Sequence, residues 1–109
     1  MQRMGMMIGV RQEKLEEYKA LHAAVWPEIL ALISSCNIRN YTIFLREPEN
    51  LLFGCWEYHG ADFEADMRKM AESEKNREWW SFCIPCQKPL ETRKDGEWWA
   101  SMDEVFHLD

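Results

Sequence analysis

The chain has 109 residues and a net charge of −6, with Lys and Arg interleaved among Asp and Glu. This length supports one domain with one core, residues 1–109, and the charge pattern lacks the basic stripe that nucleic acids and anionic membranes require. No apolar run approaches the ~18 residues of a membrane span, and Met1–Val10 lacks the pattern of a signal peptide, so we expect a cytoplasmic protein with a small-molecule partner.

The first two predicted elements are a strand and a long helical stretch. The apolar run Met4–Val10 predicts a buried strand. From Leu15 to Cys36, apolar residues recur at steps of three and four, which predicts a helix with one face in the core. Pro27 lies inside this stretch, so we expect either one helix kinked next to His22 or two helices that meet at Pro27. The inward face comprises Leu15, Tyr18, His22, Val25, Ile29, Leu32 and Cys36.

A β-hairpin is predicted next. Ile38–Leu45 and Leu51–Tyr58 are rich in β-branched and aromatic residues, and the five residues Arg46–Asn50 between them are typical of a turn. Strand alternation puts Tyr41 and Ile43 on one face of the first of these strands.

The last third of the chain predicts helix and then strand. An amphipathic helix is expected from about Ala61, and a further helical turn over Asn76–Phe82 carries the pair Trp79-Trp80. A loop rich in Pro and Gly leads to a final strand at Trp98–Leu108. The apolar face of the amphipathic helix is marked by Phe63, Met67 and Met70.

The order strand, helix, strand, strand, helix, strand predicts the fold class. It is the α+β, ferredoxin-like βαββαβ arrangement, an antiparallel four-stranded sheet with the helices on one face. We expect the other face to carry Phe44, Leu52 and Trp56 with no helix to cover them. A second copy of the sheet is the expected cover, which predicts a homodimer.

Tyr18 and His22 interrupt the apolar helical face with two proton-handling groups one turn apart. One interpretation is a core histidine that is hydrogen-bonded to a neighbour. The other is a general acid/base, because an imidazole both accepts and donates a proton near neutral pH. Helical periodicity does not decide between them.

Two further patterns suggest chemistry. Cys83-Ile-Pro-Cys86 has the spacing of a thiol redox motif, but it ends a helical turn, whereas redox motifs open one, so buried thiols are the expected reading. A metal site that joins these two cysteines to Cys55 and His59 lacks compact ligand spacing, and we expect none. The adjacent Trp79 and Trp80 cannot face the same way on a helix, so we expect at least one of them to border a ligand pocket.

Several of these residues together resemble one known family. The run Glu17-Tyr18, His22, Val25-Trp26-Pro27-Glu28 is followed in order by Asn40–Ile43, Asn50–Phe53, Trp79-Trp80 and Glu104–Phe106. This series resembles the L-rhamnose mutarotase family over nearly the whole chain.

The resemblance implies a cofactor-free isomerase of the dimeric α/β-barrel type that interconverts the α and β anomers of L-rhamnose. The histidine that matches His22 is the proton donor in that family, and the residues that match Tyr18, Tyr41, Trp79 and Trp80 bind the sugar. The chain departs from the family pattern at Leu45-Arg46-Glu47 and in the long connection Cys83–Glu97, which leaves L-fucose or another 6-deoxy sugar open as substrate.

Two other functions stay open at this point. Small dimeric monooxygenases that act on haem or a quinol share the fold and also place Trp and His in a pocket. A non-catalytic sugar-binding module would use His22 as a hydrogen-bond donor alone. The orienting partner of His22 and the details of the dimer interface are not fixed by the sequence.

Overall fold

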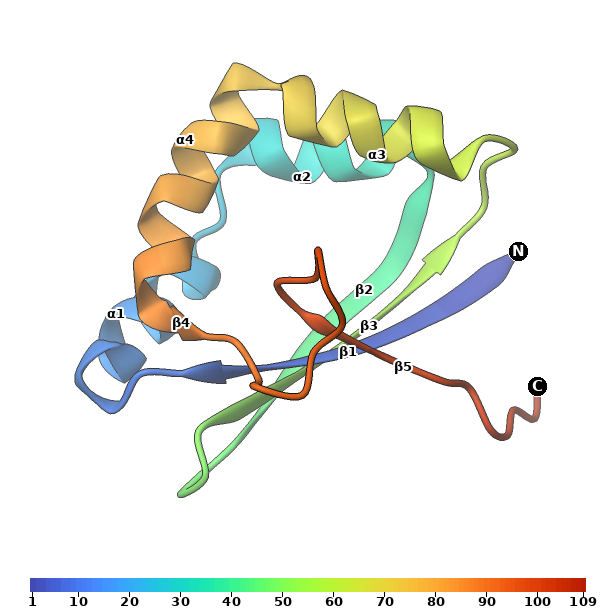
Figure 1. The fold of residues 1–109 in the computed structure, drawn as a ribbon. Helices are drawn as coiled ribbons and strands as arrows, with labels where there is room; N and C mark the ends of the chain where they lie inside the picture. Colours follow the sequence, from blue (N-terminus) through green and yellow to red (C-terminus); the bar gives the residue numbers. More distant parts are fainter.

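The computed structural model describes all residues 1–109, which form one antiparallel sheet covered on one face by helices (Figure 1). The strands are β1 (Gln2–Val10), β2 (Ile38–Arg46), β3 (Leu51–Tyr58), β4 (Gln87–Lys88) and β5 (Ala100–Met102). Their order is β2-β3-β1-β4, and β5 also pairs with β1. Every pairing is antiparallel, and the predicted ferredoxin-like arrangement is confirmed.

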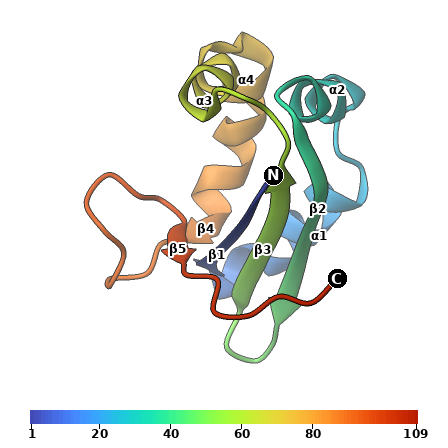
Figure 2. The same cartoon turned by 90° about the vertical axis from the view of Figure 1, so that its right-hand side faces the viewer.

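Four helices cover the sheet: α1 (Leu15–Ala23), α2 (Pro27–Ser35), α3 (Phe63–Glu72) and α4 (Glu74–Cys83). Figure 2 shows α2 beside the pair α3 and α4, above the same face of the sheet. Short 3-10 turns at Gln12–Lys14 and Ile84–Cys86 precede α1 and follow α4. None of these helices has the length and apolar character needed to cross a membrane.

The stretch around Pro27 forms two helices, the second of the two expected arrangements. Pro27 is the first residue of α2, where its missing N–H is not needed, and Ala24–Trp26 connect it to α1. This break ends α1 one residue after His22. His22 therefore lies in the last turn of a helix and not inside a kinked one.

The core lies between the sheet and the helices. Ile8 and Leu52 from the sheet pack against Leu15 and Tyr18 of α1, and Trp56 packs toward α2 and α3. The expectation that Leu52 and Trp56 lie on the open face was wrong. In β3 the buried positions are Leu52, Gly54, Trp56 and Tyr58, so strand alternation turns these four toward the helices.

The opposite face of the sheet is left open. Phe44 is 58% exposed, and its ring stacks on Phe53 with ring centroids 6.3 Å apart. Met102 on β5 is paired with Gly5 and is also exposed. The prediction of Phe44 on this face is confirmed.

The C-terminal region differs from the single strand expected at Trp98–Leu108. The free edge of β1 is shared by two short strands, with Gln87 opposite Val10 and Met102 opposite Gly5. Pro85 and Pro89 flank β4 and limit its length, because proline cannot donate a ladder hydrogen bond. Beyond Met102 the chain leaves the sheet, and the apolar side chains of the tail are almost fully exposed: Val105, Phe106 and Leu108.

Candidate active site

A cavity of about 510 Å³ lies between α2, β2 and α4, with the end of α1 at one side. This volume is within the roughly 300–1,000 Å³ range of small-molecule sites. Aliphatic residues of α2 and β2 form much of its wall. Its polar and aromatic side chains include His22, Asn40, Tyr41, Asn76, Trp79 and Trp80.

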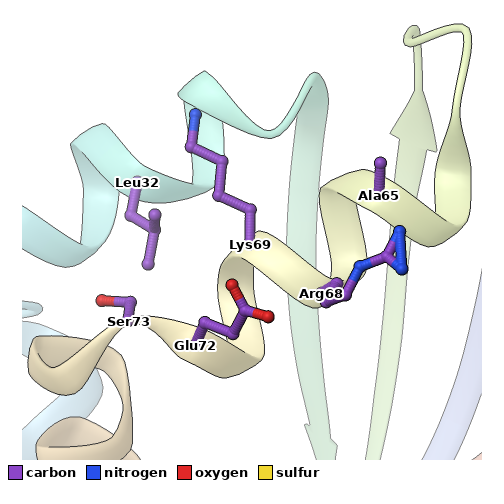
Figure 3. Close-up of a pocket in the computed structure, with 6 residues that line it drawn as sticks. All are labelled: Leu32, Ala65, Arg68, Lys69, Glu72 and Ser73. Atoms are coloured by element: carbon purple, nitrogen blue, oxygen red, sulfur yellow. The ribbon is translucent and has the colours of Figure 1, made fainter.

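A second hollow lies between α2 and α3 on the outer surface (Figure 3). It is lined by exposed Arg68, Lys69 and Glu72, with no histidine and no aromatic ring. Lys69 donates to the carbonyl of Ser35 at the end of α2. Flexible charged side chains in water offer little fixed geometry, so the cavity that contains His22 is the better candidate site.

His22 reaches the cavity from the last turn of α1. Its Nδ1 lies 3.1 Å from the carbonyl oxygen of Tyr18, one turn back. A carbonyl only accepts, so Nδ1 carries the proton in this hydrogen bond and the neutral ring leaves Nε2 as a free base. Burial lowers the pKa of His22, against the smaller opposing effect of that hydrogen bond. The imidazole is therefore neutral at pH 7.

Two aromatic rings hold the imidazole in place. The Tyr18 ring stacks on it with centroids 4.1 Å apart, and Trp79 meets it edge-on at 5.4 Å. Tyr18 itself is buried and does not line the cavity. Its hydroxyl lies 3.5 Å from the side-chain nitrogen of Gln87, whose oxygen accepts a hydrogen bond from Trp98. Tyr18 thus fixes the tautomer of His22 through its carbonyl and the orientation of the ring through stacking.

Tyr41 lies on the inner face of β2, next to a β-bulge. The register of β2 against β3 shifts between Arg39 and Thr42, and Asn40 has φ of 54°. Tyr41 shares the inner face with Ile43 by ordinary strand alternation, and the extra residue lets Ile38, opposite Tyr58, lie on that face as well. The ring is 39% exposed at the cavity, while burial raises the pKa of its hydroxyl to about 12. Tyr41 therefore keeps its proton at pH 7 and can donate it in a hydrogen bond.

The tryptophan pair divides as helical geometry requires. Trp79 is 6% exposed and packs with Ile29 and Cys83, and it also meets Trp26 at 5.1 Å. Trp80 is half-buried. Both rings line the cavity, so Trp79 joins the core to the site and Trp80 offers more free surface to a ligand.

The two cysteines of the Cys-x-x-Cys pattern are buried thiols at the end of α4. The Cys86 thiol donates to the carboxylate of Glu17 at 3.2 Å. Burial raises the pKa of Cys83 to about 12 and that of Cys86 to about 11. Both are free thiols, in the protonated form that is a poor nucleophile. No three metal-ligating side chains gather anywhere in the structure, Cys55 and His59 included.

The structure brings four of the five predicted site residues to one cavity: His22, Tyr41, Trp79 and Trp80. Tyr18 supports this group from behind His22. Sequence reasoning missed Gln87 as a partner of Tyr18 and Asn76 as a wall residue. Asn76 had a readable signal, because it precedes the two tryptophans by three and four residues and so lies between their directions on the helix surface.

Comparison with known proteins decides the family. The family model described as L-rhamnose mutarotase matches residues 3–108. The chain belongs to the L-rhamnose mutarotase family. L-rhamnose mutarotases of Oceanobacillus iheyensis and Bacillus subtilis are each 36% identical to it over 109 residues, which is 100% of both chains in each case.

Two solved structures share the fold of this family member over 100% of both chains. An L-rhamnose mutarotase from Formosa agariphila superimposes with a TM-score of 0.79 at 22% identity. Tetracenomycin F2 cyclase from Streptomyces glaucescens, a type-II polyketide cyclase, superimposes with a TM-score of 0.69 at 13% identity. At these identities the likeness shows the fold alone, and the cyclase illustrates that the fold hosts more than one chemistry.

Proposed function

We propose that this protein is a mutarotase that interconverts the α and β anomers of L-rhamnose or a related 6-deoxy sugar. The observation that carries the proposal is the free Nε2 of a neutral His22 at a cavity walled by Tyr41, Trp79 and Trp80. Membership of the L-rhamnose mutarotase family supplies the reaction and the substrate class.

The proposed ring opening consists of two transfers of one proton, and it returns the imidazole to its starting state. Nε2 of His22 takes the proton from O1–H, the C1–O5 bond breaks, and C1=O1 forms. The imidazolium then delivers the proton to O5, which leaves the open-chain aldehyde and a neutral ring. Rotation about C1–C2 turns the other face of the aldehyde toward O5, and the reverse steps close the ring as the other anomer. Such proton transfers contribute about 10²- to 10⁴-fold each to the rate.

The other four residues are proposed to hold the reactants. The Trp80 ring packs against the C–H face of the sugar and its C6 methyl, and Trp79 keeps the imidazole at a fixed angle beside it. Tyr41 donates a hydrogen bond to a sugar oxygen. Tyr18 positions His22, and because its side chain does not line the cavity, the sugar contact expected from the family resemblance stays a prediction.

A homodimer is part of the proposal. Phe44, Phe53 and Met102 form an apolar surface on the open face of the sheet, and the apolar tail residues Val105 and Phe106 lie exposed beyond it. A second copy would bury both features, and the family pattern supports it. Sedimentation equilibrium should give about twice the chain mass of 13.1 kDa. Phe44→Lys places a charge in this apolar surface and should therefore weaken the dimer. A monomeric wild type would contradict the proposed homodimer.

We also propose a cytoplasmic location. The four cysteines are free thiols, three of them buried, which is typical of proteins from a reducing compartment.

Saturation-transfer NMR on L-rhamnose tests the function. The wild type should carry magnetisation between the two anomeric protons faster than buffer alone, and it should do so without added metal or cofactor. Wild-type exchange no faster than buffer would refute the mutarotase. A strong haem absorption band, or oxygen consumption with a quinol, would instead support the monooxygenase.

A further inference from the structure

Asn76 is a buried polar residue in the wall of the cavity whose role the proposed reaction leaves open. It is 1% exposed, one of the most buried side chains of the protein. It lies in the first turn of α4, just after α3 ends at Glu72. Both backbone and side chain are engaged there: its N–H donates to Ser73 Oγ and its Nδ2 donates to the carbonyl of Met70.

These contacts fix which end of the amide is free. The Met70 carbonyl only accepts, so the atom that faces it is the Asn76 nitrogen and the other atom is the oxygen. Oδ1 has no hydrogen-bond partner in the protein, although no fully buried side-chain oxygen or nitrogen is without one. Oδ1 therefore keeps a small accessible surface, and Asn76 is one of the residues that line the cavity.

An acceptor in this position is costly unless something donates to it. A buried polar atom that loses its water without gaining a partner destabilises the fold, so such atoms are nearly always paired. The side chain of Asn76 joins α4 to α3 through the hydrogen bond from its Nδ2 to the Met70 carbonyl, and this contact does not use Oδ1. The unpaired oxygen is therefore surplus to the fold and available to a ligand with a hydroxyl donor.

The position of Asn76 suits a sugar held by the tryptophan pair. It precedes Trp79 by three residues, about 4.5 Å along the helix axis, and both side chains line the same cavity. Trp79 in turn contacts His22. A pyranose whose C1 end is at the imidazole extends its secondary hydroxyls along this wall.

We propose that Asn76 Oδ1 accepts a hydrogen bond from one secondary hydroxyl of the bound pyranose, at O2, O3 or O4, and so contributes to the choice of sugar. This proposal rests on the proposed function for the identity of the ligand class. It assigns Asn76 a binding role and no part in proton transfer.

Two variants separate the oxygen from the nitrogen. Asn76→Asp keeps an acceptor toward the cavity and removes the donor to Met70, whereas Asn76→Leu removes both at similar volume. If the oxygen binds the sugar, Asn76→Asp retains wild-type affinity within about twofold, while Asn76→Leu loses about threefold to tenfold, the usual value of one neutral hydrogen bond. If Asn76 is structural alone, the two variants lose affinity together. Ser73→Ala is the matched control. It removes the hydrogen bond from the Asn76 N–H to Ser73 Oγ and so weakens the same α3–α4 connection, but it leaves the side chain of Asn76 unchanged.

The experiment titrates wild type and variants with L-rhamnose and with its 2-, 3- and 4-deoxy analogues, using tryptophan fluorescence for the dissociation constant and saturation-transfer NMR for exchange. In the wild type and Ser73→Ala, one analogue should bind about threefold to tenfold more weakly than L-rhamnose. In Asn76→Leu, that same analogue and L-rhamnose should bind equally. A constant ratio between the sugars in all variants would overturn the proposal. Wild-type binding without exchange would count against the mutarotase alone, and a wild type that binds none of the sugars would overturn both.

Discussion

His22 and Cys86 are two proton-bearing side chains that both neighbour Tyr18, and the contrast between them explains where the chemistry lies. The imidazole stacks on the Tyr18 ring and lines the cavity, whereas the thiol is 0% exposed and packs with Tyr18 in the core. Burial favours the neutral form of both, lowering the pKa of His22 and raising that of Cys86 to about 11. A neutral imidazole is a base, but a neutral thiol is a poor nucleophile. The same environment therefore prepares one group for proton transfer and makes the other inert.

The largest expected effect comes from removing the imidazole. His22→Ala should lower the enzymatic rate of anomer exchange by about 10²- to 10⁴-fold, because the general acid/base is lost. The half-buried ring contributes little to the core, so the urea midpoint should change much less than for a core truncation. Exchange in His22→Ala at the wild-type rate would show that the His22 imidazole is as inert in the reaction as the Cys86 thiol.

Variants of the two tryptophans beside His22 test whether Trp79 belongs mainly to the core and Trp80 mainly to the ligand surface. Trp79→Ala should reduce the free energy of unfolding by about 3–5 kcal/mol, as expected for a large buried aromatic side chain. Trp80→Ala, at the half-buried neighbour, should raise KM about tenfold with a smaller loss of stability. Urea unfolding and saturation-transfer kinetics measure the two effects, and equal losses of stability would contradict the division.

The pH dependence follows from the lowered pKa of His22. The free base is needed for catalysis, so kcat/KM should fall on the acid side with an apparent pKa below the ordinary 6.5, after subtraction of the buffer rate. The free energy of unfolding should change with pH in the same direction as kcat/KM. The stabilisation linked to the neutral ring is fully present above pH 6.5 and is lost as the pH falls through the lowered pKa. An acid limb centred above 6.5 would mean that His22 is stabilised as the cation.

The smallest effect is expected from the thiol. Cys86→Ala should leave exchange within about twofold of the wild type, because Cys86 donates to Glu17 and does not line the cavity. Its raised pKa also predicts that Cys86 resists alkylation by iodoacetamide at pH 8 in the folded protein. Loss of exchange on alkylation of Cys86 would place the thiol in the chemistry.

Local patterns predicted the fold and most of the site, and contacts distant in sequence account for what they missed. The helical spacing of His22 and the adjacent tryptophans can be read from the chain, and the cavity gathers these residues. The face of Leu52 was misjudged because Leu51–Trp56 has no charged or polar side chain to mark the outer face, and packing against α1 decides it. Gln87 meets Tyr18 across 69 positions of sequence, so no periodicity could pair them.

The C-terminal strand was predicted too long for a similar reason. Alternation of apolar and polar residues continues to Leu108, but the pairing with β1 ends at Met102 opposite Gly5, although β1 itself runs on to Gln2. The apolar tail residues Val105, Phe106 and Leu108 are exposed, and the proposed homodimer would give them a partner.

The most direct test of the account is the protonation of the two His22 ring nitrogens, measured by long-range ¹H–¹⁵N NMR on protein with labelled histidine. At pH 7 the ring should be neutral with the proton on Nδ1, held by the Tyr18 carbonyl, and L-rhamnose should shift the Nε2 resonance. A ring protonated on Nε2, or an Nε2 resonance unmoved by saturating sugar, would contradict the claim that His22 presents a free base to the substrate.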